Sequence, residues 1–356
     1  MTLANAVLVV IWAGVTAYGI LGGADFGAGF WDLFAGSARK GGPVRTFLEH
    51  TIGPVWEANH VWLIFVLVFL WTAFPEPFVS IATTMYIPLT LSALGIILRG
   101  SSFAFRKWAA TLNRQRALGL TFALSSILTP FFLGTIAGGV ASGRVPLGNA
   151  AGDPVTSWLN PTSILGGVMA VGATAFIAAV FSCRDAAAIA DATLTGYFKT
   201  RAMVTGVAVG VVAVAGIGVL AVDAPELFDG LVSLRGVPLM AGSATGGLLT
   251  LWLVRQERFG PARVAAVLAT ATVLWGWGAA QYPNLLEPNI TVSGYASSNA
   301  VLIALLGAFA LAGLLAVPAL GFLFTLVERG VLGEAGDHAT ESTASLLATL
   351  VDEPEA

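Results

Sequence analysis

The second apolar stretch of the chain begins with two ionisable side chains. Glu57 and His60 are three residues apart in "PVWEANHVWL", so a helix places them on one face, about one turn apart. A carboxylate is favoured at a helix N-terminus, and an imidazole has an unperturbed pKa of ~6.5. The pair could pass protons at the edge of a membrane, although a helix-capping carboxylate and a hydrogen-bonded packing histidine would leave the same pattern.

Two further ionisable residues lie within or at the end of apolar stretches. Asp25 is part of "GILGGADFGAGFWDLF", and Arg99 ends the run "LGIILRG". Ionisable groups are costly inside a membrane and are therefore candidates for function. Asp25 is either a proton-relay carboxylate or a structural partner of Arg99. Arg99 in turn is either a counter-ion of Asp25 or Glu57, or a side chain that extends to the lipid headgroups.

Glycines surround Asp25 in the sequence. Gly23 and Gly27 are four residues apart, and Gly22 and Gly29 are seven apart. Small residues at these spacings form a surface that a neighbouring helix can approach closely. Because apolar residues continue beyond Asp25, we expect this carboxylate to be shielded by protein rather than exposed to water.

The composition indicates the kind of protein that holds these side chains. Of the 356 residues 56% are hydrophobic and 10% are charged, whereas a soluble domain usually has about 25% charged residues. The chain is therefore predicted to be an all-α protein that crosses the membrane several times. Its net charge of −3 gives no sign of nucleic-acid binding, and its single cysteine, Cys183, excludes a disulfide within the chain.

Nine stretches are apolar and long enough to cross a membrane as helices. A hydrocarbon core of ~30 Å needs about 20 residues of helix, and no alternation typical of a membrane β-barrel is seen. The tripeptide "PEP", residues 75–77, is predicted to form a tight turn between the second and third stretches. The predicted helices are 5–34, 55–74, 78–98, 118–140, 161–182, 202–222, 238–254, 262–282 and 300–326.

The basic residues predict the orientation. All but two of the 17 lysines and arginines follow odd-numbered stretches, and the exceptions are Arg144 and Arg235. By the positive-inside rule, the N-terminus is outside and the C-terminus is cytoplasmic. Residues 1–329 are predicted to form one transmembrane domain, followed by an acidic, mobile cytoplasmic tail at 330–356.

The residue types that usually hold cofactors are sparse. The histidines are His50, His60 and His338, and they form no pair within the apolar stretches that would ligate a haem. The glycines of "GADFGAGF" follow no strand, so a dinucleotide site is not indicated. We therefore expect no cofactor or metal ion to be ligated by this chain.

Five blocks of the sequence resemble subunit II of cytochrome bd-type quinol oxidases. The resemblance runs in order from the first apolar stretch to the ninth and leaves out only the acidic tail. The block around Glu57 is the most specific of them. The similar segments are "GGADFGAGFWDL", "IGPVWEANHVWLIFVLVFLWTAFP", "LRGSSFAFRKW", "SWLNPTSILGG" and "WGWGAAQYPNLLEPNITV".

The resemblance implies a membrane complex that oxidises quinol and reduces O2 to water with protons from the cytoplasm. In this family the partner, subunit I, holds haem b558, haem b595 and haem d, and subunit II ligates none of them. The implied fold has nine helices, arranged as two four-helix bundles and one peripheral helix, in the bacterial cytoplasmic (inner) membrane. Lipids, quinone and small single-helix accessory subunits are further partners that the family allows.

The resemblance also assigns a proton route. The family's residues for proton delivery from the cytoplasm fall on Asp25, Glu57 and Arg99. One departure is Ala104, at a position where some members carry an Asp at the proton entrance. Glu57, together with His60, is then the expected entrance.

Tryptophans are frequent in and near the apolar stretches. Trp56, Trp62, Trp71, Trp275 and Trp277 are expected to anchor helices at the membrane interface or to pack between them. The resemblance places Trp62 near an O2 route of some members. Trp56 is a candidate for the same route or for contact with subunit I.

Two other functions remain open at this point. A proton-coupled secondary transporter would show inverted repeats, broken helices and a polar site near the membrane midplane, whereas the charged residues here gather toward one side. A purely structural membrane subunit would use Asp25, Glu57 and Arg99 as an inert ion cluster.

Overall fold

The computed structural model describes residues 2–36, 38–52, 56–106 and 111–328. It divides into two units, Met1–Ser298 and Asn299–Ala356. In the described part of the second unit there is one helix, α13 (Asn299–Glu328). The predicted acidic tail, 330–356, lies outside the described residues.

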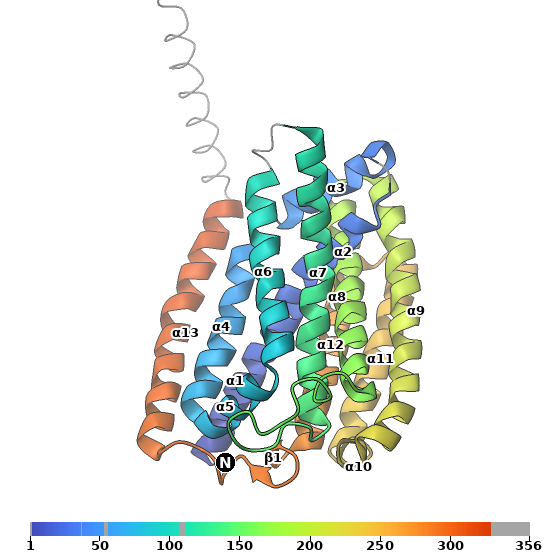
Figure 1. The fold of residues 1–356 in the computed structure, drawn as a ribbon. Helices are drawn as coiled ribbons and strands as arrows, with labels where there is room; N and C mark the ends of the chain where they lie inside the picture. Colours follow the sequence, from blue (N-terminus) through green and yellow to red (C-terminus); the bar gives the residue numbers. More distant parts are fainter. Residues whose placement is uncertain (1, 37, 53–55, 107–110, 329–356) are drawn as a thin grey trace, which may run out of the picture. The chain divides into compact units, whose positions relative to one another are not determined.

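The first unit consists of long helices that run between two ends (Figure 1). We call them the α3 end, with helix α3 (Ala38–Ile52), and the N-terminal end, with helix α10 (Pro225–Leu231). A short π-helix, η1 (Tyr18–Gly22), connects the first two helices. The other helices are α1 (Leu3–Ala17), α2 (Gly23–Leu33), α4 (Trp56–Ala73), α5 (Pro75–Thr84), α6 (Tyr86–Arg106), α7 (Leu112–Ala141), α8 (Pro161–Ala188), α9 (Ala192–Asp223), α11 (Gly236–Arg255) and α12 (Phe259–Gln281).

Polar contacts and a small hairpin close the N-terminal end. Arg144 Nη2 pairs with Asp223 Oδ1 at 2.6 Å, and Asp223 also accepts hydrogen bonds from the backbone N–H and the hydroxyl of Thr162. These bonds tie the end of α7, the start of α8 and the end of α9 together. The hairpin pairs strand β1 (Asn284–Leu286) with strand β2 (Ile290–Thr291) in antiparallel fashion.

Seven helical segments of the described residues are long and apolar enough to cross a membrane. Two more helices contain shorter apolar segments, Asn59–Ala73 and Asn299–Leu315. The prediction of an all-α, multi-pass membrane protein is confirmed, whereas nine spans and the orientation stay predictions. The seven segments are Leu3–Leu33, Tyr86–Arg106, Asn113–Ala141, Pro161–Ala188, Ala192–Asp223, Gly236–Arg255 and Phe259–Gln281.

The predicted turn at 75–77 is wrong. Pro75 begins α5, and a bend at Met85 separates α5 from α6, so the expected helix 78–98 is divided between the two. Proline suits the first position of a helix, because the N–H group that it lacks would have no partner within the helix there. The tripeptide therefore starts a helix rather than connecting two.

The apolar pattern gives no signal for α3, because charged and polar residues interrupt its apolar ones along the whole helix. Among the residues of α3 whose burial is described, the buried ones are Gly41, Val44 and Leu48. The pattern also underestimates helix lengths, as in α9, which begins at Ala192 rather than at residue 202. There the Asp191 carboxylate accepts a hydrogen bond from the backbone N–H of Leu194 at 2.9 Å and caps the helix. The first turns of α9 contain polar residues, so hydropathy does not detect them.

A large hydrophobic core lies where α2 packs against α7 and α8. Trp31 of α2 is 6% exposed, and its indole N–H donates to the Ala175 carbonyl of α8 at 2.9 Å. Phe122 of α7 and Phe176 of α8 belong to the same cluster of buried residues. This core holds the second half of the first membrane segment inside the protein.

Glycines allow α2 to approach both neighbouring helices. A Cβ atom at Gly27 would overlap the Thr174 carbonyl of α8, and a Cβ atom at Gly29 would overlap the Ser126 side chain of α7. The close helix approach predicted from the glycines around Asp25 is confirmed at these two positions. Any larger side chain would push α2 away from α7 or α8.

We expect Gly29→Ala to destabilise the protein, because the added methyl group has to displace Ser126 on the facing helix. Overpacking of this kind typically costs about 1–3 kcal/mol. Gly210→Ala on α9 is the matched control, since nothing lies within 4 Å of a Cβ atom at that position. Thermal unfolding of the purified protein measures the effect, and equal midpoints for the two variants would contradict the proposed packing constraint.

Candidate functional site

Asp25 of α2 and Arg99 of α6 form a buried ion pair. Arg99 Nη2 donates to Asp25 Oδ1 at 2.6 Å, and Arg99 Nη1 donates to Asp25 Oδ2 at 3.0 Å. The Arg99 and Asp25 side chains are only 1% and 2% exposed. Two parallel hydrogen bonds fix the planar guanidinium against the carboxylate. The expected shielding of Asp25 is confirmed, and the alternative that Arg99 extends to lipid headgroups is wrong.

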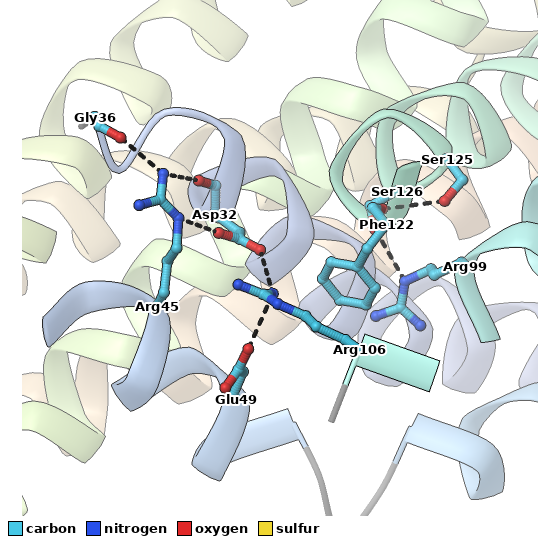
Figure 2. Close-up of polar contacts among 9 residues, drawn as sticks. All are labelled: Asp32, Gly36, Arg45, Glu49, Arg99, Arg106, Phe122, Ser125 and Ser126. Carbon is cyan, nitrogen blue, oxygen red and sulfur yellow. Dashed lines mark hydrogen bonds and ion pairs between the residues drawn. The ribbon is translucent and has the colours of Figure 1, made fainter. Parts of the chain in front are cut away.

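The remaining surface of the Arg99 guanidinium is covered by α2 and α7. Its Nε donates to Ser126 Oγ at 2.9 Å, and its Cζ lies 4.8 Å from the ring centroid of Phe122 and 5.1 Å from that of Phe26. Figure 2 shows Phe122 and Ser126 beside Arg99. Aromatic faces attract cations, so the positive charge is stabilised on its faces as well as at its edge.

Close packing of α6 on α7 sets the depth of Arg99. A Cβ atom at Gly95, one turn before Arg99 on α6, would overlap the Thr129 hydroxyl of α7. At this level, the backbone of α6 is therefore in close contact with the Thr129 side chain of α7. Arg99 reaches both Ser126 and the carboxylate of α2 because no larger residue separates these helices.

The π-helix η1 lies directly before Asp25. Its wider turn interrupts the α-helical register between α1 and α2, and such segments often occur at functional sites. Within it, Tyr18 folds its ring back over Gly22, where a Cβ atom would meet the Tyr18 ring at 2.9 Å. The apolar pattern predicts one continuous helix here and cannot detect the change in backbone hydrogen bonding.

Helix α4 supplies two side chains from the "EANH" segment to this region. Asn59 is 7% exposed and lies close enough to the Asp25 carboxylate to interact with it. The Nδ1 atom of His60 lies 3.4 Å from the Tyr18 hydroxyl, and its ring lies 5.8 Å from that of Phe26, centroid to centroid. The sequence reasoning selected His60 but missed Asn59 and Tyr18, whose roles depend on contacts between helices.

The side chains of Glu57 and Trp56 lie outside the described residues, so their predicted roles stay predictions. Trp62 is half-buried and packs edge-on against Phe65, with 6.1 Å between ring centroids. Trp71, by contrast, is 61% exposed.

Trp275 and Trp277 pack between helices of the first unit. The indole N–H of Trp275 donates to the Thr16 hydroxyl at 3.0 Å, and that of Trp277 donates to the Gln281 side chain at 2.7 Å. Trp277 also packs edge-on against Trp12. Of the two roles expected for these residues, the structure therefore favours packing.

A second ionic cluster lies toward the α3 end (Figure 2). Asp32, near the end of α2, accepts a hydrogen bond from Arg45 Nε of α3 at 2.7 Å and pairs with Arg106 Nη1 of α6 at 3.2 Å. The same Arg106 nitrogen lies 2.9 Å from Glu49 Oε1 of α3. The sequence reasoning missed this cluster, although Asp32 follows Asp25 by seven residues just as Arg106 follows Arg99.

The described residues contain no group of three or more His, Cys, Asp or Glu side chains that could hold a metal ion. His50 Nδ1 donates to the Thr46 carbonyl within α3 at 2.8 Å, and His60 faces Tyr18 on another helix. His338 lies outside the described residues. The described histidines thus sit on separate elements and form no pair suited to the two axial positions of a haem.

The family model for cytochrome bd terminal oxidase subunit II matches residues 3–327 of this chain. Among curated proteins, the chain is 32% identical over 149 residues to cytochrome bd ubiquinol oxidase subunit 2 of Bacillus subtilis (strain 168). That match spans 42% of this chain and 43% of the relative's length.

A solved structure is similar over nearly the whole chain. It comes from the structure of bd oxidase from Geobacillus thermodenitrificans, with a TM-score of 0.73 and 27% sequence identity. The alignment covers 92% of this chain and 98% of the other. Because the family model matches almost the entire sequence, the chain belongs to the cytochrome bd terminal oxidase subunit II family.

Proposed function

We propose that this protein is subunit II of a bd-type quinol:O2 oxidoreductase in the bacterial cytoplasmic membrane. It pairs with a haem-bearing subunit I, supports the assembly of that subunit, and supplies protons from the cytoplasm for the reduction of O2 to water. Nine spans, an outer N-terminus and a cytoplasmic tail after a membrane domain at 1–329 complete the proposal. The family membership and the similarity to a solved bd oxidase support it.

The observation that carries the proton role is the buried ion pair of Asp25 and Arg99. An ion pair inside an apolar protein contributes little net stability compared with well-packed apolar residues, yet removing one partner is strongly destabilising. A carboxylate whose charge is balanced by a neighbouring arginine can gain and release a proton with only a local change in charge. The pair therefore offers a place for a proton within an otherwise apolar region.

The surroundings of the pair suit such an exchange. When Asp25 is protonated, Arg99 keeps its contacts with Ser126 and with the rings of Phe26 and Phe122, so its charge remains stabilised. Asn59 of α4 interacts with the same carboxylate. We assign the approach from α4 to Glu57 and His60, and His60 contacts Tyr18 just ahead of Asp25 on the chain.

The redox centres of the complex are assigned to subunit I as haem b558, haem b595 and haem d, which supply the electron transfer and O2 chemistry. Moving one charge across the membrane against 100 mV stores ~2.3 kcal/mol. Cytoplasmic uptake of protons, combined with release of quinol protons outside, would therefore store energy without a pump.

We assign Trp62 and Trp56 to an O2 route or to contact with subunit I.

The family membership gives no support to the alternative of a secondary transporter. The purely structural alternative is favoured by one observation, the near-complete burial of Asp25 and Arg99, because such a pair could simply hold α2, α6 and α7 together. Experiments that separate assembly from turnover distinguish this alternative from the relay.

Purification through a tag on this chain tests the proposed complex. We expect a second, haem-bearing chain to copurify, and we expect the optical spectrum of the preparation to show haem d absorption with quinol-driven O2 uptake. A haem-free protein that exchanges a solute across vesicle membranes would contradict the oxidase proposal.

Substitutions of the pair test the proton role. We expect Asp25→Asn to slow quinol-driven O2 uptake by about 10-fold or more, because the carboxylate that holds the proton is lost. Glu57→Gln is expected to slow it in the same direction. Oxygen electrode measurements on complexes with matched haem content give the rates.

The double variant Asp25→Leu with Arg99→Met separates the relay from a structural role. Replacing a buried ion pair by apolar residues of similar volume is often neutral for stability, so this variant is expected to assemble with its haem absorption intact. The relay account predicts slow O2 uptake for it. Normal turnover in the assembled double variant would leave the pair with a structural role only.

A further inference from the structure

Two ion pairs of the same kind connect α2 and α6. Asp25 pairs with Arg99, and Asp32 pairs with Arg106, so each Asp meets the Arg at its own level. Within each helix the two residues are seven apart, which is two turns and about 10 Å. Two arginine side chains of α6 therefore reach α2 at two successive levels toward the α3 end.

Exposure increases from the inner pair to the outer one. The Asp25 and Arg99 side chains are 2% and 1% exposed, Asp32 is 8% exposed and Arg106 is 23% exposed. Glu49, which touches Arg106 from α3, is 43% exposed. Ionisable groups thus extend without interruption from water at Glu49 to the buried level just outside the inner pair.

Glu49 and Asp32 are close to each other because one atom contacts both. Arg106 Nη1 lies 2.9 Å from Glu49 Oε1 and 3.2 Å from Asp32 Oδ2. Arg45 of α3 also pairs with Asp32, so two arginines balance the two carboxylates. Figure 2 shows the two carboxylates on either side of Arg106.

The ring of Phe122 from α7 lies between Arg99 and Arg106 (Figure 2), and a Cβ atom at Gly29 of α2 would lie 3.3 Å from that ring. Ser102 is three residues after Arg99 and four before Arg106, so it shares their face of α6, and it is 2% exposed. Gly29 lies between Asp25 and Asp32 on α2 in the same way. A hydroxyl group can accept and donate a hydrogen bond at once, as transfer between two carboxylates requires.

We propose that Glu49 and Asp32 form the main entrance at which protons leave water for Asp25, with the approach through Glu57 and His60 of α4 as a second one; the inference rests on the proposed proton route. A proton from water binds the Glu49 carboxylate and passes to Asp32, which leaves Glu49 ionised again. From Asp32 it passes to Asp25 through water that enters beside the Phe122 ring and through the Ser102 hydroxyl. Arg106 and Arg45 balance the two carboxylates between transfers, and Ala104 in the last turn of α6 supplies no carboxylate of its own.

The test uses the purified complex with subunit I and its haems. Asp32→Asn is expected to lower quinol-driven O2 uptake about 10-fold and to make the rate fall more steeply as the pH rises, because protons become scarcer where no carboxylate gathers them. Asp32→Glu retains a protonatable group and is expected to keep most of the rate. Glu49→Gln is expected to act like Asp32→Asn but more weakly, since water reaches Asp32 beside it.

The matched control is Asp185→Asn. Asp185 of α8 also pairs with an arginine at the α3 end, since Arg263 Nη1 lies 3.4 Å from Asp185 Oδ1, but within the described residues it forms no ion pair with α2 or α6. The rate and pH profile of this variant are expected to match those of the wild type. A change in this variant would measure the general effect of losing an ion pair at the α3 end.

Three outcomes would overturn or redirect the proposal. A normal rate and pH profile for Asp32→Asn, with slow Asp25→Asn, would overturn the entrance and leave the route through Asp25 standing. Normal rates for both would overturn the proposed proton role of this chain itself. Should Asp32→Asn lose its haem absorption, Glu49→Gln decides, and a wild-type pH profile for that variant would reduce the cluster to a structural contact.

Discussion

The buried ion pair between Asp25 and Arg99 is the interaction on which this subunit's central architecture depends. An arginine placed inside an apolar protein needs every donor and face accounted for, because an uncompensated buried charge typically costs about 3–5 kcal/mol. Asp25, Ser126 and two phenylalanine rings provide that compensation from α2 and α7. The three helices therefore have to meet closely at one level.

Small residues make that meeting possible. Gly29 faces Ser126 and Gly95 faces Thr129. At both positions α7 is so close that a methyl group on the glycine would not fit. The π-helix before Asp25 changes the helical register at the same level and leaves Tyr18 beside His60. Packing, backbone geometry and charge thus converge on a single region of the first unit.

In the proposed proton route, the same arrangement connects burial to proton transfer. Arg99 keeps its contacts with Ser126 and Phe122 when Asp25 is protonated, so only part of the compensation for its charge is lost at that step. Toward the α3 end, exposure rises step by step through Asp32 and Glu49. In the proposed route, a gradient from water to a dry interior, lined by carboxylates and balanced by arginines, lets protons move without movement of a helix.

The sequence predicts much of this because the strongest signals are simple ones. Apolar length finds the membrane helices, and a carboxylate in an apolar run marks Asp25 as buried, with Arg99 as one of its possible partners. The elements that escape prediction depend on other information. Charged and polar residues interrupt the apolar ones of helix α3, the turn expected at 75–77 is a helix start, and the π-helix differs from its neighbours only in backbone hydrogen bonds.

Contacts across helices are the second limit of prediction. Asn59 and Tyr18 resemble ordinary polar residues until α4 and η1 are placed beside α2. The Asp32 and Arg106 pair joins residues 74 positions apart, and only the repeated seven-residue spacing hints at it. Glu57, by contrast, was selected from its place in a specific block, and its side chain lies outside the described residues.

The central claim, that the Asp25 carboxylate gains and loses a proton during turnover, is tested most directly by infrared difference spectroscopy. Spectra of the purified complex are recorded as quinol-reduced enzyme reacts with O2, for the wild type and for Asp25→Asn with matched haem content. The account predicts a carboxyl band that changes during the reaction of the wild type and is missing in the variant. An identical set of carboxyl bands in the two proteins would contradict it.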